Sequence, residues 1–161
     1  MKKLNLKFAI TILFVLLYNF SVALESPEKI KLQKAADDMK FQNGLEFFNL
    51  ERYDRALNEF KEYLEIYYGG SHRAEAYRKI AEIYIKKYDY QRAVNAYISL
   101  YQEYGDTEEG LDAYFQAGVC YRKMGMDEKA KSIFEQIFKE YPGTSAAQKA
   151  EMQLELLKIE N

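Results

Sequence analysis

A period of 37 residues runs through the chain, and it constrains the fold more than any other feature of the sequence. Small residues recur at Gly44, Ala81 and Gly118, and an aromatic residue follows each of them three positions later, at Phe47, Tyr84 and Tyr121. The same step relates Ala56, Ala93 and Ala130, and also Phe60, Tyr97 and Phe134. Such regular self-similarity indicates one structural unit stacked several times.

The spacing inside each unit is that of a helix pair. Gly44 and Phe47 are three residues apart, and Ala56 and Phe60 are four apart, so the members of each pair share one face of a helix. A small residue lets two helices approach closely, and the aromatic beside it fills the remaining space. With only two prolines and eight glycines among 161 residues, an all-β chain is disfavoured. The sequence predicts three antiparallel helix pairs.

Turn signals at a constant phase separate the units. Gly69-Gly70-Ser71, Gly105-Asp106-Thr107 and Pro142-Gly143-Thr144 each combine a glycine that can end a helix with a hydroxyl that can cap the next one. Ser26 followed by Pro27 suits the start of an extended first helix. The expected helices are 27–50, 53–67, 72–87, 90–104, 108–124, 127–141 and 145–159.

The last expected helix, from Ser145, has no partner in the repeat pattern. We expect its apolar residues to cover the end of the stack and its charged residues to face water, as a terminal cap requires. The apolar set is Met152, Leu154, Leu156, Leu157 and Ile159, and the charged set is Glu151, Glu155 and Lys158.

Residues 1–23 have the composition of an export signal. Three lysines precede an apolar run from Phe8 to Phe20, and Ser21-Val22-Ala23 offers small residues for cleavage after Ala23. Cleavage would remove three lysines and no acid, and would lower the formal net charge from −2 to −5. The alternative is an uncleaved membrane anchor, because Phe8 to Leu24 is just long enough to span a bilayer.

The sequence offers no constellation for catalysis or metal binding. The chain has one histidine, His72, and one cysteine, Cys120, which leaves no Cys/His metal cluster and no intramolecular disulfide. We interpret His72 as a surface residue of a first helical turn and Cys120 as a small buried hydrophobe. No phosphate-binding loop occurs, and charges of both signs recur throughout, which is not typical of nucleic-acid binders. We therefore expect no enzyme, no cofactor and no nucleic-acid partner.

At the positions of the 37-residue period the sequence resembles the tetratricopeptide repeat. The pattern of that repeat, a small residue, an aromatic, an alanine and a second aromatic, matches all three units. The resemblance implies an all-α, right-handed α-solenoid of three helix pairs with an extended first helix and a C-terminal capping helix. It divides the chain into a signal peptide, a helix extension, three repeats and a cap, at 1–23, 24–36, 37–70, 74–107, 111–144 and 145–161. The longer period and the export signal look most like the bacterial periplasmic branch, which includes the Tol-Pal-associated cell-division coordinator and the outer-membrane assembly lipoproteins.

The resemblance also implies that the first helix of each pair lines an inner, concave groove. Residues there that do not serve the core become candidates for binding a peptide or helix of a partner, with aromatic anchors and peripheral charges. These candidates are Phe41, Leu45, Phe48, Arg78, Glu82, Ile85, Lys86, Phe115, Val119, Arg122 and Lys123. The competing interpretation is that several of the aromatic residues belong to the core and that the charged ones are merely solvated.

The leading hypothesis is an exported adaptor of the cell envelope that binds another envelope protein or peptide segment, in a Tol-Pal or outer-membrane assembly. The alternative is a membrane-anchored structural subunit that self-associates through tyrosine-rich outer faces. A homo-oligomer and, with an uncleaved anchor, a membrane contact stay open at this stage.

Overall fold

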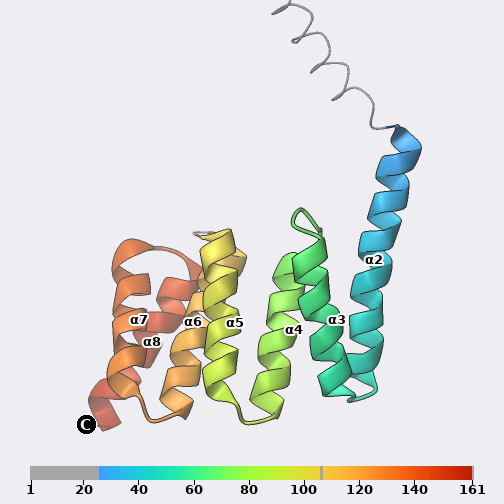
Figure 1. Ribbon diagram of the computed structural model, residues 1–161. Coiled ribbons are helices and arrows are strands. Elements are labelled where there is room, and N and C mark those ends of the chain that lie inside the picture. Colours follow the sequence, from blue (N-terminus) through green and yellow to red (C-terminus); the bar gives the residue numbers. More distant parts are fainter. Residues whose placement is uncertain (1–25, 106, 161) are drawn as a thin grey trace, which may run out of the picture. The chain divides into compact units, whose positions relative to one another are not determined.

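The computed structural model describes residues 26–105 and 107–160, which form seven α-helices and no strand (Figure 1). The predicted export signal lies outside these residues. The helices are α2 (Pro27–Asn49), α3 (Tyr53–Ile66), α4 (Arg73–Lys86), α5 (Tyr90–Tyr104), α6 (Glu108–Lys123), α7 (Asp127–Glu140) and α8 (Ser145–Glu160). At 23 residues, α2 is the extended first helix that the sequence predicts. The described residues divide into two compact units, with the boundary between Ala36 and Asp37.

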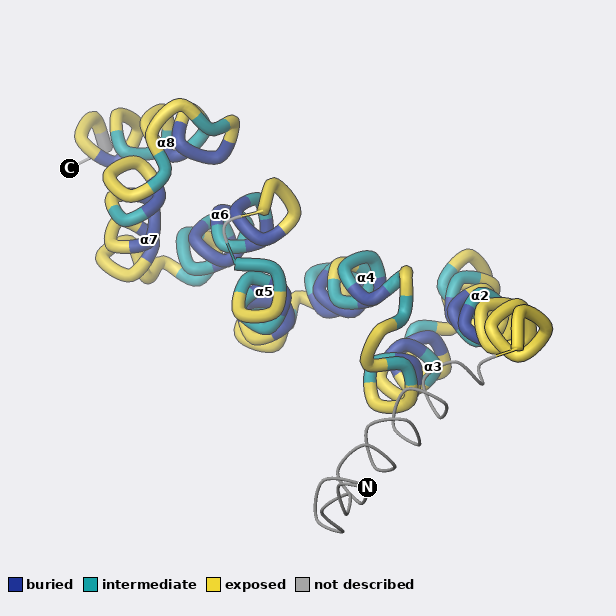
Figure 2. Tube along the Cα trace, turned by 90° about the horizontal axis from the view of Figure 1, so that it is seen from above, coloured by how far each residue is buried: buried dark blue, intermediate teal, exposed yellow. Residues whose placement is uncertain are grey.

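Within residues 37–161 the helices form a solenoid of pairs arranged in two rows. Figure 2 shows α4, α6 and α8 in one row and α3, α5 and α7 in the other, with each helix packed beside its neighbours in the chain. The most deeply buried side chains, among them Phe60, Leu100 and Phe134, lie on the helix faces that meet between the rows. The predicted all-α solenoid is therefore confirmed for this part of the chain.

The small residues of the repeat lie where the two helices of a pair approach each other closely, as their spacing suggests. A Cβ atom added to Gly44 would lie 2.5 Å from a ring carbon of Phe60, and one added to Gly118 would lie 2.6 Å from a ring carbon of Phe134. These distances are far below ordinary contact, so in the first and third pairs the second helix can pack this closely only on glycine, while the second pair has Ala81 at this position. The period thus encodes the contact between the two helices of a pair.

The helix boundaries agree with the sequence to within one residue, but one predicted cap is wrong. Thr107 and Thr144 accept hydrogen bonds from the backbone N–H groups of Gly110 and Ala147 and cap α6 and α8 as expected. Ser71 does not cap α4. Its hydroxyl donates to the carboxylate of Asp37 instead, and the helix begins after His72 without a side-chain cap.

The terminal helix α8 combines a buried face with an exposed apolar face. Leu157 and the alanines of its first turns are buried and Leu154 is half-buried, which confirms a cap. The three remaining apolar side chains, Met152, Leu156 and Ile159, are 61%, 44% and 80% exposed. The expectation that they would cover the end of the stack is wrong, because the buried stripe of α8 is too narrow to include them.

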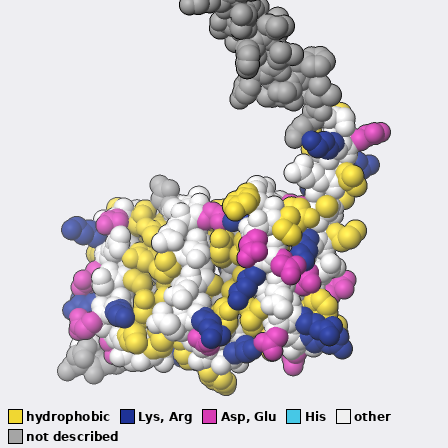
Figure 3. Space-filling view, in the orientation of Figure 1, with side chains coloured by type: hydrophobic (Ala, Val, Ile, Leu, Met, Phe, Trp, Pro, Cys, Tyr) yellow, Lys and Arg dark blue, Asp and Glu magenta, His cyan; other side chains and the backbone are white. Residues whose placement is uncertain are grey.

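The described surface carries mixed charge. Figure 3 shows Lys and Arg side chains interspersed with Asp and Glu on the face drawn. Among the described tyrosines Tyr68 and Tyr88 are exposed, and nine others are half-buried. Across residues 26–105 and 107–160, every helix is too short or too polar to cross a membrane.

Candidate functional site

The helices α4, α6 and α8 present a continuous exposed surface, which we call the first-helix face. They lie in one row (Figure 2), and the 37-residue step connects them. Lys149 of α8 donates a 2.8 Å hydrogen bond to Asp112 of α6, exactly one period away in sequence. Arg122 of α6 donates a 2.8 Å hydrogen bond to Gln153 of α8. These bonds show that α8 continues the phase of α6 on this face.

A cavity of about 540 Å³ opens on this face between the three helices. Arg78 of α4, Asp112 of α6 and Lys149 of α8 line it, with Leu111 contributing apolar surface. The first turn of α6 adds Glu108 and Glu109 to the rim. The cavity therefore offers charges of both signs to a bound chain, beside an apolar patch.

Two of the predicted groove aromatics belong to the core. Phe41 is 2% exposed and stacks on the His72 ring, with ring centroids 4.5 Å apart and planes 7° from parallel. Phe115 is 7% exposed and packs against Phe134. Their assignment as binding anchors is wrong, because both rings fill the space between the rows instead of reaching the surface.

Four other apolar candidates are half-buried. Leu45, Phe48, Ile85 and Val119 pack against the core and keep part of their surface accessible. The ammonium group of Lys79 lies 4.4 Å from the centroid of the Phe48 ring, a cation–π contact that covers this aromatic.

The charged candidates remain on the surface or close to it. Arg78, Lys86 and Lys123 are exposed. Glu82 is half-buried and accepts a 3.1 Å hydrogen bond from Lys79. Arg122 is also half-buried and is held by Gln153. These side chains can steer a partner, but the structure gives none of them a desolvated pocket.

Sequence reasoning missed the contribution of α8 to this face. Met152, Leu156 and Ile159 follow Phe115, Val119 and Arg122 by 37 residues, and their spacing of four and three places them on one helix face. They form an exposed apolar group on α8. Extending the period by one further step would have found them, because α8 occupies the place of the first helix of a fourth pair.

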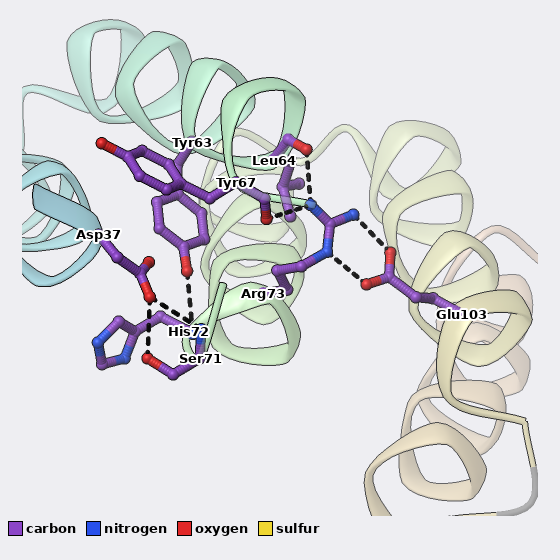
Figure 4. Close-up of polar contacts among 8 residues, drawn as sticks. All are labelled: Asp37, Tyr63, Leu64, Tyr67, Ser71, His72, Arg73 and Glu103. Carbon is purple, nitrogen blue, oxygen red and sulfur yellow. Dashed lines mark hydrogen bonds and ion pairs between the residues drawn. The ribbon is translucent and has the colours of Figure 1, made fainter. Parts of the chain in front are cut away.

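A polar network fixes the linker between the first two pairs (Figure 4). The Asp37 carboxylate accepts hydrogen bonds from the Ser71 backbone N–H at 3.0 Å and the Ser71 hydroxyl at 3.1 Å. The Tyr63 hydroxyl accepts one from the His72 backbone N–H at 3.0 Å. Linker residues 71–72 are thereby tied to both helices of the preceding pair.

The buried Arg73 makes the second half of the network. Its guanidinium donates to the carbonyl oxygens of Leu64 and Tyr67 at 2.6 and 2.9 Å and forms a bidentate pair with Glu103 of α5. Because the planar guanidinium satisfies the last carbonyls of α3 and a carboxylate of α5 together, it sets the spacing of successive pairs.

Two carboxyl groups of the network have depressed pKa values. Burial raises the pKa of Asp37, but hydrogen bonds from Tyr63 and Ser71 outweigh it and hold the pKa below its ordinary value. The hydrogen bonds from Arg73 likewise hold the pKa of Glu103 below its ordinary value. Both groups are therefore ionised at neutral pH, and Asp37 acts as a structural acceptor.

Neither Ser71 nor Cys120 is placed for nucleophilic chemistry. The His72 ring lies 2.8 Å from the carboxylate of Asp38 and is half-buried, so its interpretation as a surface residue is wrong. The Ser71 hydroxyl points to Asp37, so these residues form no triad. Cys120 is buried as expected, and burial raises the pKa of its thiol to about 11. The described residues hold no cluster of three metal-ligating side chains.

The fold and its exposed first-helix face define a helical repeat protein. Residues 75–107 and 112–144 match the family model of the tetratricopeptide repeat. The two matched segments correspond to the α4–α5 and α6–α7 pairs and are similar to tetratricopeptide repeats. α2 packs on α3 through Gly44 and Phe60 in the same way as α6 packs on α7 through Gly118 and Phe134. A comparison with curated proteins found no match. Repeats of this kind typically bind protein partners and serve as non-enzymatic scaffolds, which supports a role in protein–protein interaction.

Proposed function

We propose that the protein is an exported adaptor of the bacterial cell envelope that holds a segment of another envelope protein on its first-helix face. The observation that carries the proposal is the exposed apolar group Met152, Leu156 and Ile159 on the same face as the cavity between α4, α6 and α8. Clustered apolar side chains beside a polar-lined cavity are typical of interaction sites. Export rests on the sequence of residues 1–23, with cleavage near Ala23.

The charges of this face indicate the composition of the partner segment. Glu75 lies in the first turn of α4, Glu108 and Glu109 lie in the first turn of α6, and Lys86 and Lys123 lie in the last turns of these helices. One edge of the face is therefore acidic and the other basic, with apolar residues of α8 adjoining. A complementary segment has apolar anchors with acidic residues on one flank and basic residues on the other. An amphipathic helix or an extended peptide of this composition fits.

The process that this adaptor serves is proposed from the sequence resemblance alone. Its export signal and long repeats resemble proteins of Tol-Pal-linked cell division and of outer-membrane assembly. The partner would then be an envelope protein that exposes such a segment in the periplasm.

The test places a photo-crosslinking residue at Met152 in living cells and identifies the adducts by mass spectrometry. The matched control is the same probe at Ile66 of α3, which is 62% exposed but lies in the other row. We expect a discrete adduct with another envelope protein from Met152 and none from Ile66. Identical adducts at both positions would contradict a site on the first-helix face.

A second experiment measures the contribution of the apolar patch. Leu156→Glu is expected to reduce capture of the crosslinked partner by about tenfold or more, because a charged carboxylate replaces an apolar contact. Ile66→Glu should leave capture unchanged. Circular dichroism checks that both variants keep the wild-type helix content, and equal capture by the two variants would count against the proposal.

A further inference from the structure

A second cavity lies between α7 and α8, away from the first-helix face, and we call it the end groove. It measures about 650 Å³, and Phe138 of α7 with Leu154 and Leu157 of α8 supplies its apolar surface. Phe138 is 46% exposed and is the most exposed of the described phenylalanines.

The end groove is strongly acidic. Five of its ten lining residues are carboxylates, from both helices, against two lysines, so its formal charge is −3. Glu135 of α7 and Glu151 of α8 are exposed members of this set. An occupant of the groove must therefore present apolar side chains together with positive charge.

Residues 26–36 of the same sequence have this composition. The segment carries three lysines and one glutamate, a formal charge of +2, and it is helical from Pro27 onwards. Ile30 and Leu32 expose 52% and 72% of their surface. Because they are two positions apart on a helix they point to different sides, so one of them, Ile30, can turn into the groove and bury its exposed apolar surface there.

The lengths also agree. Ten helical residues extend about 15 Å at 1.5 Å per residue, and the twelve residues of α7 from Asp127 to Phe138 extend about 18 Å. A short helix can therefore lie along the groove with Ile30 inward, and Lys29 and Lys31, each about 100° from Ile30 around the helix, over the flanking carboxylates.

We propose that the end groove binds residues 26–36 of a second copy of this chain. The two contacting surfaces are different patches of the molecule, so the contact is head-to-tail and can repeat from copy to copy. It leaves the first-helix face free, and it holds whether or not the proposed adaptor function is correct. The protein would thus present several first-helix faces in one assembly.

The test is sedimentation velocity on the full protein, purified in the form that the cell produces, at protein concentrations across the micromolar range. Two charge-reversed variants are compared: a head variant, Lys31→Glu with Lys34→Glu, and a tail variant, Glu135→Lys with Glu151→Lys. We expect the wild type to associate with rising concentration and each variant alone to associate at least about tenfold more weakly, because like charges then face each other.

Mixing the two variants gives the decisive result. The reversed head is acidic and the reversed groove is basic, so an equimolar mixture should regain wild-type association, which no misfolded variant could do. The matched control, Glu46→Lys with Glu65→Lys, reverses two exposed acids outside the groove and should associate like the wild type. A monomeric wild type, unaffected variants, or a mixture that stays monomeric would each overturn the proposal.

Discussion

Glu51, Tyr88 and Gly125 occupy equivalent places, each at the turn inside a helix pair, and all three have positive φ values of 56°, 57° and 68°. The same two backbone hydrogen bonds close each turn, for example from Tyr88 to Ile85 and from Asp89 to Tyr84. This is the Schellman geometry that glycine favours. Only the third turn has glycine, so the other two retain the steric cost of a side chain in the left-handed region.

Replacing Tyr88 by glycine should therefore stabilise the protein. We expect Tyr88→Gly to raise the free energy of unfolding by about 1 kcal/mol, because the left-handed strain disappears. Few contacts are lost, since Tyr88 is 81% exposed. Gly125→Ala should lower it by a similar amount. Urea unfolding followed by circular dichroism measures both changes, and a destabilised Tyr88→Gly variant would show that the strain is not there.

At the scale of elements, the linker network joins α2, α3, α4 and α5 through ionised groups, which makes their packing sensitive to acid. The folded pKa values of Asp37 and Glu103 lie below their ordinary values, while the unfolded chain has values of about 4. The stabilisation is therefore fully present above about pH 5 and is lost as the pH falls through the folded pKa values. Arg73 keeps its charge throughout, because Glu103 raises its pKa further.

We expect the free energy of unfolding to stay level from pH 7 to about pH 5 and to fall below about pH 4. Asp37→Asn should be less stable than the wild type at pH 7. Its free energy of unfolding should also fall less on acidification, because the carboxyl group with the lowered pKa has been removed. Glu65→Gln, at an exposed position of α3, serves as the control. Urea titrations at several pH values measure the slopes, and parallel wild-type and Asp37→Asn profiles would contradict this account.

The sequence predicted the helices well because their determinants are local. Small residues, aromatics and turn signals lie within a few positions of the contacts they make, so boundaries fall within one residue. It did not predict the pairing of Arg73 with Glu103, since these residues are 30 positions apart and belong to different pairs. Periodicity also could not show that Phe41 and Phe115 point into the core. On the first helix of a pair, the residues that face the groove and those that face the core lie side by side and recur with the same period.

At the scale of the whole repeat unit, residues 37–161, each helix depends chiefly on its neighbours in the chain. α5 packs against both α4 and α6, and α6 packs against α5, α7 and α8. The helices at the two ends have neighbours on one side only. In a linear array, stability follows nearest-neighbour contacts, so the ends open more easily than the middle.

Amide hydrogen exchange measured by mass spectrometry should therefore show a gradient. We expect the strongest protection in α5 and α6, where Val94, Leu100 and Ala117 are fully buried, and progressively faster exchange towards residues 37–49 and α8. Leu157→Ala should accelerate exchange in α8 and α7 more than in α5, because it removes a buried contact at one end of the array. Leu156→Ala, next to it but 44% exposed, should change little. Uniform protection and a uniform response to Leu157→Ala would instead mean that the array opens as one cooperative unit, and that its neighbouring helices are coupled more strongly than their contacts suggest.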